Sequence, residues 1–217
     1  MSIPIQARTN MVERQVRPNR VSDERVISAL SSVPRENFLP GSLKSVAYLD
    51  EEIEVAPGRF VIEPMVLARL LQVAGVGADD VALDIGCASG YSTAVLAHLA
   101  GTVVALEEDE RLAGKAGQVL TAMEIGNAAV VSGPLGAGYP GEGPYDVILI
   151  AGRIGVLPDQ VTDQLAEGGR LVTVMEIGSV GKAVLVTRNQ GVVGRRIIFD
   201  AWVPPMPGFE KRAGFDF

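Results

Sequence analysis

A glycine-bearing turn offers the clearest chemistry in this sequence: "ALDIGCASGYS", residues 82–92. The apolar residues before the turn predict a buried strand, and those after it predict a helix. Glycine at such a junction lets the backbone approach a nucleotide closely. Carboxylates stand nearby, with Asp84 two residues before Gly86 and Glu107 at the end of the next predicted strand. The junction therefore predicts a site for a nucleotide-like ligand.

Two phosphate-binding patterns do not fit this turn. A dinucleotide site favours G-x-G-x-x-G, whereas the corresponding positions here hold Gly86, Ala88 and Tyr91. A phosphate-cradling loop favours G-x-x-x-x-G-K-[ST], and no lysine stands near the turn. The sequence therefore argues against both kinds of phosphate site.

S-adenosylmethionine fits the turn better, because it carries no phosphate and its ammonium and sulfonium groups favour nearby carboxylates. An acid at the end of the second strand, here Glu107, can accept both ribose hydroxyls, as in dinucleotide sites. Glu108 and Asp109 make the rim more anionic. The alternative is an ordinary βαβ turn with an acidic helix start at residues 107–110, which requires the turn, both acids and the strand pattern to coincide. We predict S-adenosylmethionine, or its product S-adenosylhomocysteine, over residues 86–90.

An alternation of short strands and helices, starting at residue 81, has to position these side chains. Such alternation is typical of βαβ units and of a mainly parallel sheet with helices on both faces. The last two strands have only "QGVV" between them and predict an antiparallel pair at one edge. The expected fold is a doubly wound α/β sheet of seven strands. The expected strands are 81–86, 102–107, 128–132, 145–152, 169–175, 182–189 and 194–202, and the expected helices are 91–100, 109–123 and 158–169.

Two helices are expected before the sheet. The first has Ser22 as its predicted N-cap and Pro34 beyond its end. A polar, turn-rich passage leads to the second, which has Pro64 in its first turn and Gly75 or Gly77 at its end. The apolar stripe of the first helix comprises Val26, Ala29, Leu30 and Val33.

The chain is expected to divide into two parts that pack as one compact unit. Residues 1–63 form an N-terminal helical, substrate-side extension, and residues 64–217 form the cofactor-binding domain. The tail is rich in proline but carries Phe209, Phe215 and Phe217, so we expect it to pack against the body.

Composition narrows the functions further. Nineteen basic against 26 acidic residues give a net charge of −7, which argues against nucleic-acid or anionic-membrane binding, since both need a cationic face. A single cysteine, Cys87, excludes an internal disulfide. No uncharged apolar run approaches the ~18 residues of a membrane span, and the first residues lack a secretory pattern, so we expect a cytoplasmic protein. No Cys/His/Asp cluster suggests a metal.

The sequence resembles the class I methyltransferases and, within them, the protein-L-isoaspartate (D-aspartate) O-methyltransferase family. The stretch "MVERQVRPNRVSDERVISALSSVPRENFLP" is similar to that family's N-terminal helical segment, and "AYLDEEIEV" to its "AY.D.PLPI" stretch. "LDIGCASGYSTAVLAHLAGTVVALE" resembles its cofactor motif and the acid that follows, while "GPYDVILIAG" and "QLAEGGRLVTV" resemble its fourth and fifth strands. The resemblance covers most of the chain. It implies S-adenosylmethionine as cofactor and an isoaspartyl peptide or protein, or a small carboxylate, as methyl acceptor.

Two positions depart from the family pattern. The family places "TIS", then Gln or Ala and Pro, before the cofactor domain, and its serine helps to hold the isoaspartyl carboxylate. Aligned on Pro64, this chain has Phe60 for the threonine and Ile62 for the serine. After the third strand the family has "GDG", whose acid lies near the adenine, and Ser132 stands at that place here. The first change alters the chemistry of the acceptor site, whereas the second weakens one adenine contact.

The candidate residues follow from the turn and from the resemblance. No catalytic side chain is assigned, because an acceptor carboxylate is already ionised at pH 7 and needs no general base. His98 is expected to be structural, and Cys87 a small residue packed in the turn. The acceptor loop is Arg59, Phe60, Val61, Ile62 and Glu63, where backbone amides and Arg59 remain to hold a carboxylate; the cofactor-binding residues are Asp84, Gly86, Cys87, Ala88, Gly90, Glu107, Glu108, Ser132, Gly133 and Pro134.

Three hypotheses remain open from the sequence. The first is a repair enzyme that methylates isoaspartyl sites in proteins or peptides, or a related carboxylate. The second is a methyltransferase with a changed acceptor, since Phe60, Val61 and Ile62 make the approach apolar. The third is a homologue that binds the cofactor or its product without catalysis. In each case we expect a monomer or a homodimer.

Overall fold

The computed structural model describes residues 3–211 of the chain. Short helical turns precede or connect the main elements at Val12–Val16, Arg17–Asn19, Arg35–Phe38, Gly41–Val46, Leu135–Ala137 and Pro140–Glu142. The helices are α1 (Ile3–Met11), α2 (Glu24–Ser32), α3 (Pro64–Ala74), α4 (Tyr91–Ala97), α5 (Glu110–Ala122) and α6 (Asp159–Thr162). The strands are β1 (Ile53–Ala56), β2 (Arg59–Val61), β3 (Val81–Ile85), β4 (Thr102–Glu107), β5 (Ala128–Ser132), β6 (Tyr145–Ile154), β7 (Leu165–Ile177), β8 (Val180–Asn189) and β9 (Val192–Asp200).

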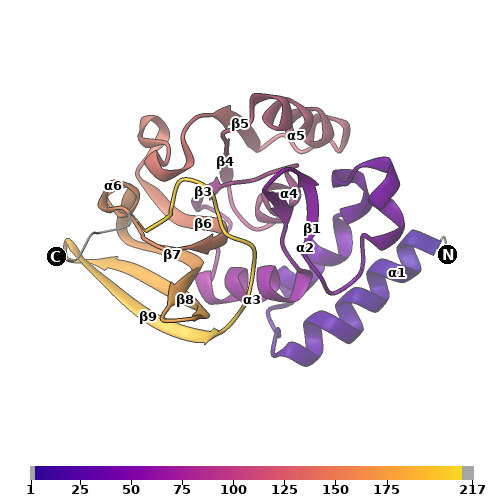
Figure 1. Cartoon of the computed structure of the whole chain (residues 1–217), viewed down its shortest axis with the longest axis horizontal. Coiled ribbons are helices and arrows are strands. Elements are labelled where there is room, and N and C mark those ends of the chain that lie inside the picture. Colours follow the sequence, from indigo (N-terminus) through magenta and orange to yellow (C-terminus); the bar gives the residue numbers. More distant parts are fainter. Residues whose placement is uncertain (1–2, 212–217) are drawn as a thin grey trace.

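A seven-stranded sheet of order β5-β4-β3-β6-β7-β8-β9 forms the centre of the molecule. The pairs β4–β5, β3–β4, β3–β6 and β6–β7 are parallel, while β7–β8 and β8–β9 are antiparallel. Figure 1 shows the indigo N-terminal helices at one end of the molecule and the orange-to-yellow β8–β9 edge at the other. The predicted α/β sheet with an antiparallel edge is confirmed.

Successive side chains of the buried strands pack alternately into two separate hydrophobic cores, one on each face of the sheet. In β3, Ala82 joins the core that contains the N-terminal helices, whereas Leu83 and Ile85 join the opposite core. This alternation is the period-two pattern of a strand covered on both faces. The C-terminal segment packs into the second core through Met206 and Phe209.

The tail therefore packs against the body as predicted, at least through Phe209, which is 2% exposed. Phe215 and Phe217 lie outside the described residues. Residues 203–209 run beside the carboxyl end of β6, where the backbone N–H of Arg153 donates to the carbonyl of Pro204 (2.8 Å) and that of Met206 to the carbonyl of Arg153 (2.7 Å). We call residues 203–209 the C-terminal strap.

The predicted stripe of α2 is confirmed, because all four of its apolar residues are buried. The predicted N-cap is wrong by one residue. Asp23 caps the helix through its carboxylate, which accepts from the N–H of Arg25 (2.9 Å). The N–H of Ser22 instead donates to the side chain of Gln72 (2.7 Å). A carboxylate at the helix start also meets the positive end of the helix dipole, which favours Asp23 over a hydroxyl.

Helix α3 begins at Pro64 as predicted and ends before Gly75, whose φ of +58° makes the left-handed cap. The helix predicted over 158–169 is wrong in its second half. Only Asp159–Thr162 is helical, and β7 begins at Leu165, which pairs with Tyr145. Tertiary pairing with β6 overrides the weak helical pattern of "QLAEGG" in that stretch.

The polar passage before α3 contains a hairpin that the sequence did not predict. β1 and β2 pair antiparallel, and Gly58 between them has a φ of +68°. The hairpin matters because it places Arg59 next to the predicted cofactor site. Within residues 3–211 no helix is both long enough and apolar enough to cross a bilayer.

Candidate functional site

The glycine turn joins β3 to α4 at the carboxyl end of the central strands, as predicted. Gly86 and Gly90 have φ values of +78° and +94°, which favour glycine. Ala88 lies in the same left-handed region at +50°, and its N–H donates to the carboxylate of Glu107 (2.8 Å). The N–H of Gly86 also donates to the carbonyl of Leu106 (2.8 Å). The turn is thus fixed from the end of β4.

Asp84 is fully buried beneath this turn. One of its oxygens, Oδ2, accepts from the hydroxyls of Ser92 and Thr93, each at 2.7 Å. The other oxygen, Oδ1, has no hydrogen-bond partner. Burial, with a further contribution from Glu107, raises the pKa of Asp84 to about 6. An acceptor without a donor at this depth fits a ligand that brings a hydrogen-bond donor or a positive charge.

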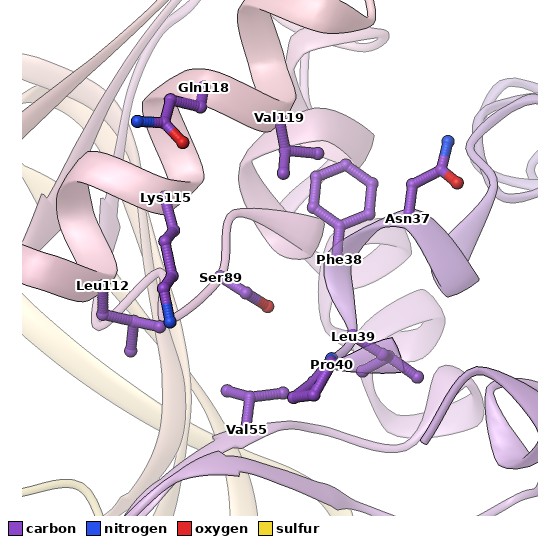
Figure 2. Close-up of a pocket in the computed structure, with 10 residues that line it drawn as sticks. All are labelled: Asn37, Phe38, Leu39, Pro40, Val55, Ser89, Leu112, Lys115, Gln118 and Val119. Carbon is purple, nitrogen blue, oxygen red and sulfur yellow. The ribbon is translucent and has the colours of Figure 1, made fainter. Parts of the chain in front are cut away.

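A cavity of about 290 Å³ opens on the α5 side of the turn. Figure 2 shows Ser89 in the midst of its lining. The Ser89 hydroxyl is buried and has no partner. Most of the remaining wall is apolar and comes from the helical turn Arg35–Phe38 and the two residues after it, from β1 and from α5. The lining residues are Asn37, Phe38, Leu39, Pro40, Val55, Ser89, Leu112, Lys115, Gln118 and Val119.

Glu107 lies at the end of β4, as predicted, and is fully buried. Its Oε1 accepts from the backbone N–H groups of Glu108 (3.0 Å) and Asp109 (3.2 Å), and its Oε2 from that of Ala88. Arg59 completes the set, donating from Nε to Oε1 (3.1 Å) and from Nη2 to Oε2 (2.6 Å). Both oxygens that would accept the ribose hydroxyls are therefore held by a guanidinium.

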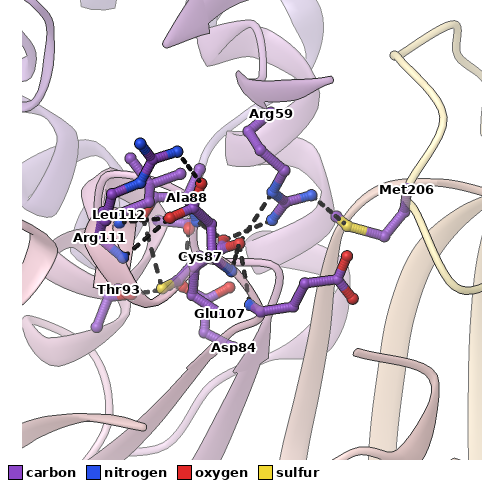
Figure 3. A network of polar contacts seen from close by, with 12 residues as sticks. Arg59, Asp84, Cys87, Ala88, Thr93, Glu107, Arg111, Leu112 and Met206 are labelled. Atoms are coloured by element: carbon purple, nitrogen blue, oxygen red, sulfur yellow. Dashed lines mark hydrogen bonds and ion pairs between the residues drawn. The ribbon is translucent and has the colours of Figure 1, made fainter. Parts of the chain in front are cut away.

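Arg59 lies between the carboxylate of Glu107 and the sulfur of Met206, as Figure 3 shows. Arg59 is 6% exposed and Met206 is 4% exposed. The Nη1 of Arg59 lies 3.1 Å from the sulfur of Met206. A Cβ added at Gly86 would stand 2.4 Å from the methyl carbon of Met206. The side chain of Met206 thus occupies the space that the missing Cβ of Gly86 leaves free.

Little space is left on this side of the turn. Two cavities flank the acceptor loop, one lined by Ile62 and Cys87 and the other by Arg59 and Met206, and each measures about 10 Å³. Such a volume holds one water at most, whereas pockets for drug-sized ligands measure about 300–1,000 Å³. The carboxylates of Asp84 and Glu107 are hydrogen-bond acceptors that suit S-adenosylmethionine. The cavities beside them are too small for this cofactor while Arg59 pairs with Glu107.

The acceptor loop is apolar around Phe60 and Ile62, as its sequence predicts. Ile62 is 3% exposed and faces a cavity that Phe60 also lines. The carbonyl of Val61 accepts from the buried Arg35 (3.3 Å). Arg59, which the sequence offered as a binder of a substrate carboxylate, is instead paired with Glu107. Glu63 is half-buried, and burial raises its pKa to about 7, with the charges of Asp50 and Glu52 adding to the effect.

The remaining candidates surround the turn at its rim or in its core. Cys87 is buried, and burial raises the pKa of its thiol well above the usual range, which suits a packing residue. The Glu108 side chain is exposed. In the β4–β5 register Ser132 stands opposite Glu107, and the N–H of Gly133 donates to the carbonyl of Glu107 (3.2 Å). Gly133 is half-buried, and Ser132 and Pro134 are exposed.

Two features of the site escaped sequence reasoning. No local pattern links Arg59 or Met206 to Glu107, because the three residues come from separate parts of the chain. The one available signal was an arginine directly after a glycine, at the hairpin turn. His98 lies exposed at the end of α4, and within residues 3–211 no group of three or more His, Cys, Asp or Glu side chains could hold a metal.

Comparison with known proteins gives a consistent picture. The family model described as protein-L-isoaspartate(D-aspartate) O-methyltransferase matches residues 6–204. Protein-L-isoaspartate O-methyltransferase 1 of Rhodopseudomonas palustris (strain HaA2) is 37% identical over 185 residues, covering 84% of this chain and 75% of that protein. Protein-L-isoaspartate O-methyltransferase of Methanoculleus marisnigri is 34% identical over 186 residues, covering 86% of this chain and 84% of that protein.

Two solved structures share the fold. One, named protein-L-isoaspartate O-methyltransferase, superposes with a TM-score of 0.82 at 22% identity, over 94% of this chain and 67% of that one. The other is a putative protein-L-isoaspartate O-methyltransferase from Plasmodium falciparum in complex with S-adenosyl-L-homocysteine, with a TM-score of 0.79 at 19% identity. It covers 96% of this chain and all of that one. At these identities the likeness bears on the fold.

Proposed function

Because the chain belongs to the protein-L-isoaspartate(D-aspartate) O-methyltransferase family, we propose that it methylates a carboxylate with S-adenosylmethionine as donor. The acceptor class is the isoaspartyl carboxylate of a protein or peptide. The observation that carries the proposal is the pair of buried acids at the ends of neighbouring strands, Asp84 in β3 and Glu107 in β4, on either side of the glycine turn.

The chemistry requires little of the protein beyond alignment. When bound, S-adenosylmethionine supplies a methyl group activated by its sulfonium. The carboxylate that accepts the methyl is already ionised at pH 7, so the reaction needs no general base. Orientation of the two reactants can supply up to ~7–11 kcal/mol. Glu107 would hold the ribose, Asp84 would face the positive end of the cofactor, and Phe60 and Ile62 would keep water out.

The methyl acceptor is proposed only as a class, whereas the methyl donor is proposed as one compound. A buried isoleucine at residue 62 offers no hydrogen bond to a carboxylate. Backbone N–H groups of the loop are left for that role. A small carboxylate as the acceptor, a role in protein repair, a cytoplasmic location and a monomeric or homodimeric state stay predictions from the sequence.

The proposal is tested by transfer of tritium from methyl-labelled S-adenosylmethionine to an isoaspartyl peptide. The same peptide with a normal aspartyl residue is the control. We expect base-labile label on the isoaspartyl peptide alone, since a methyl ester hydrolyses in alkali. Cofactor binding without transfer to this peptide would point to a different acceptor, and a screen of cell extract for labelled products would then search for it. No binding and no transfer would refute the proposal.

A further inference from the structure

We propose that Arg59 and Met206 form a latch that competes with the cofactor for Glu107, so that the cofactor enters only when these two side chains leave. The inference rests on the proposed function, because it concerns how the same site is opened. It makes Arg59 a residue that sets affinity for the donor rather than one that binds the acceptor.

The first argument is the number of hydrogen bonds at Glu107. A carboxylate has about four lone-pair sites. Three backbone N–H groups, from Ala88, Glu108 and Asp109, and two N–H groups of Arg59 already donate to it. A ribose diol would donate to the same two oxygens. The backbone donors are fixed by the fold, so the diol can bind only in place of the guanidinium.

The second argument is space. Met206 lies against two glycines, and a Cβ at Gly86 or at Gly152 would stand 2.4 Å or 2.8 Å from its methyl carbon. A ligand that approaches the turn closely needs the same volume. Methionine has three rotatable bonds and adapts to irregular spaces, so it can withdraw at low cost. The strap backbone can stay in place meanwhile, held by Arg153 on one side and by Phe209, whose carbonyl accepts from Gly155 (2.9 Å), on the other.

The third argument is charge. Glu107 is fully buried, and a buried carboxylate without a partner strongly destabilises the fold. Arg59 supplies the compensating positive charge in the closed site. The ribose diol that would replace Arg59 is neutral, so an incoming cofactor has to offset the loss of this charge at Glu107, and the Arg59–Glu107 pair therefore lowers affinity for the cofactor. Asp84 Oδ1, which has no donor in the closed site, remains available to the incoming ligand.

The test is calorimetric titration of S-adenosylhomocysteine into the full chain and three variants. Arg59→Ala removes the guanidinium, and Met206→Ala opens space while leaving the Arg59–Glu107 pair intact. Arg111→Ala is the matched control, because it removes one positive charge beside Asp109 on an exposed side chain that does not touch Glu107. We expect Arg59→Ala to bind about tenfold tighter or more, the factor for a site that is open a tenth of the time or less.

The companion variants decide the outcome. We expect Met206→Ala to bind tighter than the parent by a smaller factor and Arg111→Ala to match the parent. If Arg59→Ala binds no tighter, or more weakly, and Met206→Ala equals the parent, the latch is refuted while the cofactor assignment survives. If Arg59→Ala proves unfolded by thermal melting, the affinity of Met206→Ala relative to the parent supports or refutes the latch by itself. If neither the parent nor any folded variant binds, both the latch and the proposed cofactor fail.

Discussion

The two sides of the glycine turn are lined by different residues and end in opposite states. On the β4 side, Glu107 is covered by Arg59 and Met206, and the cavities there measure about 10 Å³. On the α5 side, beside Ser89, a cavity of about 290 Å³ stays open. The first side contains a buried charge and the second contains mostly apolar side chains.

The difference follows from the chemistry of the two walls. A cavity lined by Phe38, Leu39 and Val119 can remain open, because apolar walls leave no charge without a partner. A site built on a buried carboxylate needs a counter-charge at once. The chain supplies that counter-charge from the β1–β2 hairpin. Substitutions on the two sides of the turn should therefore have effects on stability and binding that differ in size and in sign.

The largest expected effect is the loss of charge at Glu107. Glu107→Gln keeps the shape but only one of the two oxygens that accept from backbone N–H groups. It also leaves the guanidinium of Arg59 buried without a counter-ion. Breaking a buried ion pair from one side costs about 3–5 kcal/mol. We expect the free energy of unfolding, measured in urea, to fall by about that amount.

The double variant Arg59→Met/Glu107→Gln is the control for this prediction. Replacing both partners by neutral side chains of similar length removes the unpaired charge, so most of the lost stability should return. A Glu107→Gln variant within about 1 kcal/mol of the parent would mean that Arg59 does not depend on Glu107. The contrast between the two sides of the turn would then lose its electrostatic basis.

We call the β4 side of the turn the closed side. Its turn and its two acids could be predicted from the sequence, but the contacts of Arg59 and Met206 there could not. The turn, Asp84 and Glu107 follow from local patterns, since a strand, its glycine and its terminal acid lie within short stretches. Arg59 is 48 residues from Glu107 along the chain, and Met206 is 147 residues from Arg59. Such contacts depend on how the hairpin and the strap pack, and no spacing rule encodes them.

The same limit explains the errors in secondary structure. The strands of the parallel sheet were found because they are buried on both faces and carry unbroken apolar runs. The hairpin of β1 and β2 was missed because its strands are short and partly polar. The end of α6 was misplaced because pairing of Leu165 with Tyr145 outweighs the local helical preference.

The second prediction concerns the apolar wall of the closed side. Ile62→Ser restores a hydroxyl where the loop now offers an isoleucine to a substrate carboxylate. A hydrogen bond to a charged group is worth about 1.5–3 kcal/mol. We expect kcat/KM for an isoaspartyl peptide to rise roughly ten- to hundredfold, measured in the tritium assay.

Ile62→Ala serves as the matched control, because it removes the same bulk without adding a donor. Both variants should lose stability, since truncating a buried isoleucine to alanine costs about 2–5 kcal/mol. Equal activity of the two variants would assign the gain to space rather than to the hydroxyl. A parent already as active as Ile62→Ser would show that the loop needs no serine.

The third prediction uses the pKa of Asp84, which burial raises to about 6. Only the ionised form attracts the ammonium group that S-adenosylhomocysteine carries, so affinity for this ligand should fall as the pH falls from 7 to 5. The expected loss is about tenfold, since the ionised fraction drops by roughly that factor across the pKa. Calorimetry at several pH values measures it.

The neutral variant Asp84→Asn identifies the group responsible. Its amide oxygen can still accept from Ser92 and Thr93, so the turn should keep its shape. Its affinity should be weak at pH 7 and should vary little down to pH 5. The raised pKa has a second consequence: the folded chain holds the proton more tightly than the unfolded chain, so this group's contribution to stability declines as the pH rises from about 4 to about 6.

The smallest effect is expected at Ser89, on the α5 side of the turn, which we call the open side. Its hydroxyl is buried without a partner, and such a group opposes folding until something pairs with it. Ser89→Ala should leave the free energy of unfolding unchanged or raise it by up to about 1 kcal/mol.

Ser92→Ala is the counterpart on the closed side, where the lost hydroxyl donates to Asp84 (2.7 Å) and the loss should cost about 1.5–3 kcal/mol. If urea unfolding shows Ser89→Ala to be as damaging as Ser92→Ala, the Ser89 hydroxyl has a partner in solution. Ordered water in the 290 Å³ cavity would supply one, and the open side would then be a hydrated polar site and not the apolar counterpart of the latch.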